Sequence, residues 1–261
     1  MTAVEGELEF LLRSENRTGA LLALREGQPL DRYELETRLD ASRRTVRRAV
    51  EALTERGYIT EGEAGYALTA YGAAMVDAYR DLLDRGRLAE QYRPFLERLD
   101  TRRVDLDPAL LEGSELTVAS EVSPFTLLNR LLELRAEASR VREVAPGIEK
   151  NSVEQLGERV RDGEDFEMEV VLPPAAVEAV EEDAGFAGDH IAARESAAVD
   201  FYVTDGPVRV FLGVLDDTVA LAAGTDGQPE ALVESEDPAL RAWAEARIDE
   251  VRDGATPLSE Y

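Results

Sequence analysis

Two predicted helices within residues 31–57 are separated by only two residues, and this spacing constrains the fold more than any other feature of the chain. Asp31 and Glu34 have the three-residue spacing of a capping box, which predicts the start of a short helix. Ser42 is a suitable N-cap for the next helix, which we expect to end at Gly57. Two helices joined by so short a turn are typical of a helix-turn-helix motif.

The second of these helices has one apolar face and one basic face. The apolar positions repeat at i, i+3, i+4 and i+7 and are Val46, Ala49, Val50 and Leu53. The other face carries four arginines, and an arginine fork fits phosphate oxygens and guanine edges best. We therefore expect these residues to contact double-stranded DNA: Ser42, Arg43, Arg44, Thr45, Arg47 and Arg48. The alternative is a solvated face whose arginines pair with nearby glutamates, but a position on the second helix of the motif favours DNA contacts.

A two-stranded wing follows. Residues 58–60 and 66–68 predict two short strands joined by a glycine-containing turn. Three helices, a wing and the phrases LTERGYIT and GYALTAYG resemble winged-helix transcription regulators of the ArsR, MarR and TrmB kinds over about residues 7–75. The resemblance implies that the arginine-rich helix enters the major groove and the wing lies against the DNA backbone or minor groove. Glu61 and Glu63 make the wing tip acidic, which argues against strong phosphate contacts there.

Helical patterns flank the motif on both sides. Residues 7–27 predict two helices, and residues 73–99 continue a helical pattern with breaks near Gly86 and at Pro94. A helix that leaves a wing commonly pairs with its copy in a second chain. We favour a homodimer, since two reading heads one helical turn apart match a palindromic site. Packing within one chain is the alternative.

Charge is distributed unevenly along the chain. The 261 residues carry a formal net charge of −26, with 15 arginines against 19 acidic residues in residues 1–100 and 14 cations against 36 acids beyond. This excludes a uniformly basic nucleic-acid binder but allows a basic binding surface confined to one part of the chain. The uneven charge also indicates two domains with different partners. Only one of the 29 cations is lysine. An acidic chain so poor in lysine resembles the proteins of salt-in halophilic archaea, whose carboxylates hold water and cations at high salt.

Composition also excludes several chemistries. The chain has no cysteine and a single histidine, His190, so we expect no disulfide, no cysteine-ligated metal and no metal site of clustered histidines. No apolar run approaches the ~18 residues of a membrane span, and the first residues carry no positive region. We expect a cytoplasmic protein without membrane contact. No GxSxG, Walker or GxGxxG phrase is present, so we expect no enzyme, no catalytic residue and no cofactor.

From residue 104, predicted strands and helices alternate. The expected strands are 115–120, 141–146 and 166–172, followed by consecutive strands within 198–224 and a last strand at 230–235. Helices are expected after each of the first three strands and after Pro238. Such alternation favours a mainly parallel sheet with helices on its faces. The predicted fold is thus an α+β winged helix-turn-helix domain at 5–72, a helical connector at 73–103 that could serve in dimerisation, and an α/β domain at 104–255.

The C-terminal phrases carry a second resemblance. VAPGIEK, VVLPPAAVEAV, FLGVLDDTVALAAG and PEALVESEDPALRAWAEARIDEV resemble the middle and C-terminal part of haloarchaeal regulators related to FilR1, the methanogenesis regulator. Related TrmB regulators have a phospholipase-D-like α/β domain that binds a small molecule, so the resemblance implies a sensor or dimerisation unit and a small-molecule effector. The phospholipase-D motif itself is absent, because His190 precedes Ile191 and Ala192 and the only lysine, Lys150, lies far away.

Open α/β sheets bind ligands beyond the C-terminal ends of their strands. This predicts a ligand site formed by Ser120, Glu121, Ser123, Pro146, His190 and Arg194. Each residue also has a simpler interpretation, since the serines suit helix caps, the proline a loop, and His190 the surface. The combined prediction is a dimeric, sequence-specific transcription regulator. A winged-helix module that binds proteins without specific DNA binding is the alternative.

Overall fold

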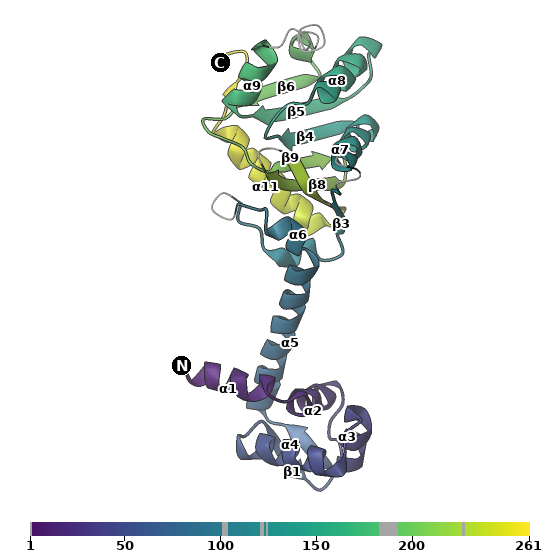
Figure 1. The fold of residues 1–261 in the computed structure, drawn as a ribbon, viewed down its shortest axis with the longest axis vertical. Coiled ribbons are helices and arrows are strands. Elements are labelled where there is room, and N and C mark those ends of the chain that lie inside the picture. The colour runs from purple at the N-terminus through teal and green to yellow at the C-terminus, as the bar shows by residue number, and fades with distance from the viewer. Residues whose placement is uncertain (1, 101–103, 121–122, 124, 183–192, 226–227) are drawn as a thin grey trace. The chain divides into compact units, whose positions relative to one another are not determined.

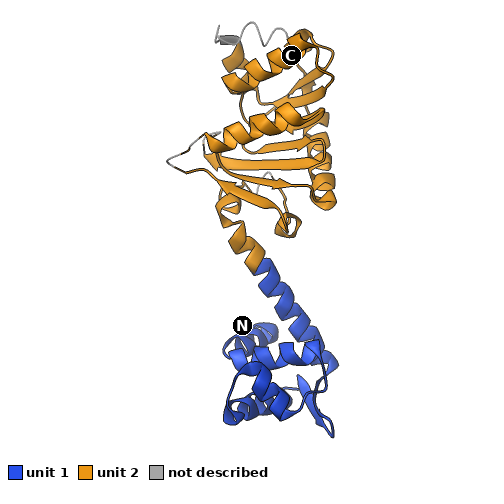
Figure 2. Cartoon of the chain, turned by 90° about the vertical axis from the view of Figure 1, so that its right-hand side faces the viewer, with its two compact units in different colours: residues 1–86 blue, residues 87–261 orange. Residues whose placement is uncertain are grey.

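The computed structural model describes the chain apart from residues 1, 101–103, 121–122, 124, 183–192 and 226–227. The chain divides into two compact units, residues 1–86 and 87–261, coloured separately in Figure 2. The boundary falls inside one helix, so the segment predicted as a connector contributes residues to both units. No helix of the described part is long and apolar enough to span a membrane.

Unit 1 contains the predicted helices and the wing (Figure 1). Its elements are α1 (Ala3–Leu12), α2 (Glu15–Glu26), α3 (Arg32–Leu39), α4 (Arg43–Glu55), β1 (Ile59–Gly62), β2 (Gly65–Leu68) and most of α5 (Ala70–Gln91). Strands β1 and β2 pair antiparallel as a hairpin. An isolated bridge joins Leu30 to Tyr66 of β2. The predicted helices and the two-stranded wing are therefore confirmed.

Local signals in the sequence form the turn between α3 and α4. The Asp31 carboxylate accepts a hydrogen bond from the backbone N–H of Glu34 at 2.8 Å, and the Glu34 carboxylate accepts one from the Asp31 N–H at 2.7 Å, so the capping box is complete. Asp40 ends α3 in the left-handed conformation with φ 46°, which asparagine and aspartate tolerate better than most residues. The Ser42 hydroxyl then accepts a hydrogen bond from the Thr45 N–H at 3.3 Å and caps α4.

One core holds unit 1 together. The predicted apolar stripe of α4 is buried and packs with side chains of α1, α2 and α3, together with Tyr58, Tyr66 and Val76. Gly72 allows α5 to begin directly against the chain at Tyr58, because a Cβ at residue 72 would lie 1.9 Å from the Tyr58 carbonyl oxygen. This contact accounts for the glycine that follows the wing.

The predicted break at Gly86 is wrong, since α5 continues through it to Gln91. A glycine inside a helix costs only about 1 kcal/mol relative to alanine, and here the intact helix outweighs that cost. The helix instead ends before Pro94, which lies in the first turn of the short helix α6 (Arg93–Leu96). Phe95 of α6 and the adjoining Tyr92 are fully buried in the core of unit 2.

Unit 2 is an eight-stranded sheet covered by helices (Figure 1). Its remaining elements are a 3₁₀ turn (Pro108–Leu111), β3 (Glu115–Val118), α7 (Thr126–Glu137), β4 (Arg140–Val144), α8 (Lys150–Asp162), β5 (Glu167–Leu172), α9 (Pro174–Glu182), β6 (Val199–Val203), β7 (Phe211–Leu215), β8 (Thr218–Thr225), β9 (Gln228–Ser235), α11 (Pro238–Asp253) and β10 (Thr256–Pro257). The strand order is β10-β6-β5-β4-β7-β8-β9-β3. Helices lie on both faces, as predicted.

The prediction of a mainly parallel sheet is wrong. Only β4 with β5 and β5 with β6 pair in parallel, and the other five neighbouring pairs are antiparallel. Strand β7 does not continue beside β6 but inserts antiparallel to β4, and the hairpins β7–β8 and β8–β9 extend the sheet from there. The alternation of strand and helix predicts parallel pairing only across the β4 to β6 stretch. Asp216 lies in the turn between β7 and β8 with φ 50°.

Both faces of this sheet are apolar. Leu221 and Val233 point to the face covered by α11, while Ala222 and Leu232, one residue along each strand, point to the face covered by α7, α8 and α9. Successive residues of a strand point to opposite faces, so strands without a polar side are buried on both. The sheet is thus the middle layer of three.

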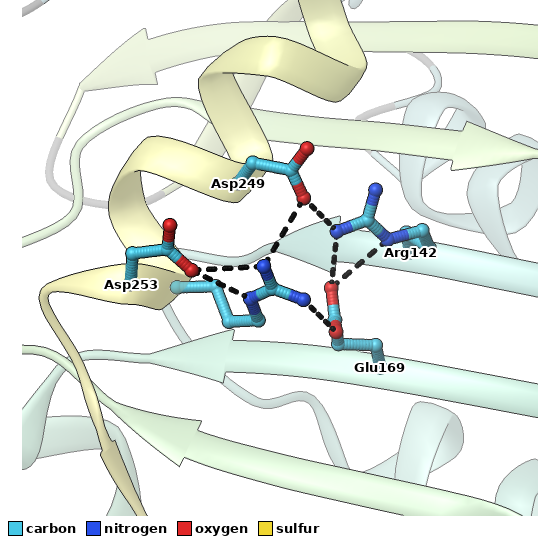
Figure 3. Close-up of polar contacts among 5 residues, drawn as sticks. Arg142, Glu169, Asp249 and Asp253 are labelled. Carbon is cyan, nitrogen blue, oxygen red and sulfur yellow. Dashed lines mark hydrogen bonds and ion pairs between the residues drawn. The ribbon is translucent and has the colours of Figure 1, made fainter.

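Charged side chains interrupt the apolar faces at a few places. On the α11 face, Arg142 of β4 donates to Glu169 of β5 at 2.8 Å and to Asp249 of α11 at 2.6 Å, and Figure 3 shows both carboxylates turned toward it. On the opposite face, Arg135 of α7 donates two hydrogen bonds to Glu143 of β4. Each charge inside the layers therefore has an opposite charge within hydrogen-bond distance, as buried ions require.

Candidate functional site

The basic face of α4 is exposed, as its sequence spacing requires. Ser42, Arg43, Arg44, Arg47 and Arg48 are exposed and Thr45 is half-buried. The buried stripe fixes this orientation, because α4 packs against the rest of unit 1 through its apolar residues. The guanidinium groups therefore project from the helix toward solvent.

Most of these arginines have no carboxylate beside them. Arg47 forms an ion pair with Glu51 at 3.0 Å, one turn along the helix, with its side chain 64% exposed. Arg43, Arg44 and Arg48 have no ion-pair partner among the residues that the structure describes. The alternative interpretation of the cluster, a face neutralised by neighbouring glutamates, therefore applies to one arginine of the four.

Two further arginines lie together on the ring of Phe10, and one of them, Arg56, is paired with Glu7 at 2.9 Å. Arg17 of α2 and Arg56 after α4 lie over the ring of Phe10, with their guanidinium carbons 4.1 and 4.0 Å from its centroid. Burial lowers the pKa of Arg17, and the nearby positive charges of Arg56 and Arg48 lower it further. The effect of Arg48 places Arg17 in the field of the α4 cluster. Sequence reasoning missed Arg17, since nothing in the spacing of residues 10 and 17 connects them to α4.

The start of α3 also presents candidate contacts that the sequence prediction missed. Tyr33 is 76% exposed, which is unusual for so large a ring. The neighbouring Arg32 donates to the Tyr66 hydroxyl at 3.1 Å and so joins α3 to β2 of the wing. The signal available in the sequence was a tyrosine placed in the first turn of the helix that begins after Asp31.

The wing carries negative charge at its tip. Glu61 and Glu63 are both exposed, as the sequence predicts. Gly65 is required beside them, because it has φ +120° and a Cβ there would lie 2.4 Å from the Leu30 carbonyl oxygen. The wing is thus fixed against the start of α3 while its tip stays acidic.

The predicted ligand residues that the structure describes, Ser120, Ser123, Pro146 and Arg194, do not line one common cavity. Pro146 lines a cavity of about 110 Å³ together with Gly147, Arg135 and Phe211. Arg194 lines a different hollow, beside Ser196 and Pro257. Glu121 and His190 lie outside the described residues.

The serines after β3 have the simpler role. The Ser120 hydroxyl accepts a hydrogen bond from the Ser123 N–H at 3.2 Å, and neither serine is among the residues lining the Pro146 cavity. Strands β7, β8 and β9 separate β3 from β4, so the segments that follow these two strands are not neighbours.

The part of the chain that the structure describes contains no group of three or more histidine, aspartate or glutamate residues able to hold a metal ion. The acidic residues of unit 2 are instead engaged with arginines or spread over its surface, as in the pairs of Arg130 with Glu234 and Arg98 with Glu230. In the second pair, hydrogen bonding from Arg98 lowers the pKa of Glu230.

Solved structures show only distant similarity. The archaeal chromatin protein TrmBL2 aligns over 95% of this chain and 97% of its own, with 13% identity and a TM-score of 0.44. A phosphatidylserine synthase from Haemophilus influenzae aligns over 56% of this chain and 39% of its own, with 13% identity and a TM-score of 0.38. No curated protein matched the chain.

Family models match both units. Residues 5–91 match the HVO_A0261 N-terminal domain, which covers the winged helix and α5. Residues 124–254, half of the chain, match the middle domain of the methanogenesis regulatory protein FilR1, which extends from α7 to α11. The first match covers most of unit 1 and the first residues of unit 2, and the second match lies within unit 2. The chain belongs to the family defined by the middle domain of the methanogenesis regulatory protein FilR1, here with an HVO_A0261 N-terminal domain.

Proposed function

We propose that this protein is a sequence-specific DNA-binding transcription regulator, a homodimer that reads the major groove with α4 and binds a small effector in unit 2. In this proposal Arg43, Arg44, Arg47 and Arg48 contact base edges and phosphates, and Ser42 and Thr45 contact the backbone at the N-terminal end of the helix. The residues named belong to the second helix of a helix-turn-helix, which is the helix that such motifs insert.

One observation carries the proposal. Three exposed arginines of α4 have no carboxylate partner among the described residues, although acidic residues outnumber cations almost two to one in the whole sequence. In so acidic a chain, an arginine face would be expected to attract glutamates from its own surface. An arginine face without neighbouring glutamates is suited to bind an external anion. Guanidinium groups form bidentate hydrogen bonds with phosphates and guanine edges.

The test starts from DNA selected by the wild-type protein from a random pool, followed by footprinting on the selected sequence. Arg44→Ala and Arg47→Ala should each cost about 1–3 kcal/mol if the residue contacts a guanine in bidentate geometry, and should relax the base preference at one position. Arg80→Ala, an exposed arginine on α5 of the same unit, is the matched control. Unchanged footprints of the Arg44→Ala, Arg47→Ala double variant would falsify the major-groove assignment.

The proposed dimer has a candidate surface of its own. Val4 and Leu12 on α1 and Leu82 on α5 are each at least half exposed. Within the 73–103 segment, Val76 is buried in the core of unit 1 and Tyr92 in the core of unit 2. Leu82 lies between these two residues in the sequence and belongs to neither core. Leu82→Glu should shift the dimer toward monomer in analytical ultracentrifugation, and a wild-type protein that sediments as a monomer would exclude the dimer.

The alternative, a protein-interaction module, predicts a different result from the same selection. Such a module would enrich no sequence from the random pool, and its binding to DNA would be equally weak for all sequences. Enrichment of a palindrome with two half-sites one helical turn apart would support both the DNA-reading role and the dimer.

A further inference from the structure

A cavity of about 480 Å³ lies in unit 2 on the face of the sheet that α11 covers. Its lining includes apolar residues from four elements, among them Val144 of β4, Leu212 of β7, Leu221 of β8 and Val251 of α11. Small-molecule sites typically enclose about 300–1,000 Å³ and are lined mainly by hydrophobic side chains with a few polar groups. The cavity beside Pro146 is too small for this range, and the α11 cavity is within it.

The polar groups of this cavity are mainly cationic. Arg209, in the loop before β7, and Arg247 of α11 both line it, and Asp100 is the acidic residue among its lining residues. Arg209 is exposed and has no ion-pair partner among the described residues. Arg247 is already engaged, in part with Glu250, and the side chains of this pair are 29% and 69% exposed. Ion pairs in contact with solvent contribute little to stability, so a ligand anion can compete for this guanidinium.

We infer that this cavity binds a small organic anion, with its carboxylate or phosphate held by Arg209 and Arg247 and its apolar body against Val144, Leu212 and Leu221. Two guanidinium groups beside an apolar floor are the donors that such a ligand requires. This inference names the site and the ligand class of the effector in the proposed function. Calling the ligand an effector rests on the proposed function, whereas binding of the ligand can be measured without DNA.

The chain contains a built-in reporter for this site. Trp243 is the single tryptophan of the protein and is one of the residues that line the cavity. Its indole N–H donates a hydrogen bond to the Asp105 carbonyl oxygen at 3.0 Å, which orients the ring. A ligand in the cavity contacts or displaces solvent from this ring, so intrinsic fluorescence follows occupancy.

The experiment titrates the full-length protein with phenylacetate, an aromatic carboxylate, and with phenylacetamide, its neutral isostere, while Trp243 fluorescence is recorded. Saturable binding of phenylacetate is expected. Arg209→Gln and Arg247→Gln should each weaken it about tenfold or more, as expected for loss of a charge-assisted hydrogen bond. Arg140→Gln is the matched control, since Arg140 is exposed at the other end of β4 from Val144 and does not line the cavity. Val251→Phe, which fills the space, should abolish binding in a variant whose circular dichroism is unchanged.

Each other outcome overturns the inference. Equal binding of phenylacetamide would exclude an anion site, and equal weakening by Arg140→Gln would indicate a general effect of charge. A wild-type titration with no saturable change would exclude the site. The Arg44→Ala, Arg47→Ala double variant separates this inference from the proposed function, because it should lose specific DNA binding and keep phenylacetate binding unchanged.

Discussion

The guanidinium of Arg135 donates hydrogen bonds of 2.8 and 3.0 Å to the two carboxylate oxygens of Glu143, and both side chains are buried, with 10% and 4% of their surface exposed. The Arg135 guanidinium also donates to the Ser152 hydroxyl at 3.1 Å and lies over the ring of Phe211. This pair joins α7 to the centre of the sheet at β4.

Glu143→Gln should therefore destabilise unit 2 strongly. The substitution leaves the Arg135 charge buried without a counter-charge, which costs about 3–5 kcal/mol in free energy of unfolding. Urea unfolding followed by Trp243 fluorescence measures this unit, because the single tryptophan lies in it. The double variant Arg135→Met, Glu143→Leu should recover most of the loss, since apolar replacement of a whole buried pair is often neutral or stabilising. A double variant as unstable as Glu143→Gln would contradict this account.

Two glycines of α5 should respond oppositely to alanine. A Cβ at Gly72 would lie 1.9 Å from the Tyr58 carbonyl oxygen, whereas nothing lies within 4 Å of a Cβ at Gly86. Gly72→Ala should lower the free energy of unfolding of unit 1 by about 1–3 kcal/mol or more through overpacking. Gly86→Ala should stabilise α5 by about 0.5–1 kcal/mol. Thermal unfolding followed by far-ultraviolet circular dichroism tests both signs, and a stabilising Gly72→Ala would be inconsistent with the close approach.

Removing the acids of the wing should strengthen DNA binding. Glu61→Gln with Glu63→Gln removes two exposed negative charges from an element that winged helices place near the DNA backbone. At about 0.5 kcal/mol for each exposed charge, affinity for the selected sequence should rise about two- to fivefold at low salt, and less at high salt. Glu26→Gln, exposed at the end of α2, is the control and should change nothing. Fluorescence anisotropy measures the affinities, and unchanged binding of the double variant would place the wing away from DNA.

Acid should remove the contribution of Asp249 to stability. Hydrogen bonding from Arg142, with its positive charge and that of Arg252, holds the pKa of Asp249 below its ordinary value. A depressed folded-state pKa contributes stability above the unfolded value of about 3.9, and this stability is lost as pH falls through the folded pKa. Asp249→Asn should therefore cost about 0.5 kcal/mol at neutral pH, a small value because the side chain is half exposed.

The same variant should match the wild type in acid. Melting temperatures measured from neutral pH to below pH ~4 should converge for the two proteins as Asp249 becomes protonated. Glu245→Gln, an exposed residue on the same helix, is the control and should track the wild type throughout. A difference between Asp249→Asn and wild type that persists in acid would show that packing, not charge, explains the effect.

Unit 1 could be predicted closely because its determinants are local. The caps at Asp31 and Ser42 and the stripe of Val46 and Val50 each act within one or two helical turns, and short-range signals of this kind are legible in a single sequence. The one error, a break at Gly86, arose where a weak local preference conflicts with a long helix.

The sheet of unit 2 could be predicted only in part, because strand order depends on pairing between distant segments. The longer strands were recognisable from their apolar runs, whereas the two-residue β10 was not predicted. No local signal distinguishes β7 beside β6 from β7 beside β4. The described residues of the predicted ligand site are separated for the same reason, since Ser120 and Pro146 follow strands that are not neighbours. The α11 cavity combines residues from position 100 to position 251, and such a set has no spacing to recognise.

The adjacent charges of β4 have a consequence for how the sheet assembles. Arg142 meets Asp249 on one side of the sheet, and Glu143 meets Arg135 on the other. In a sheet that is apolar on both sides, sliding a strand by one residue exchanges one hydrophobic set for another with little penalty, so hydrophobicity alone specifies alignment poorly. A one-residue slip of β4 would carry Arg142 to the side of Arg135 and Glu143 to the side of Asp249, and would set like charge against like. Two neighbouring residues of opposite charge thus favour the observed register of the central strand over registers shifted by one residue.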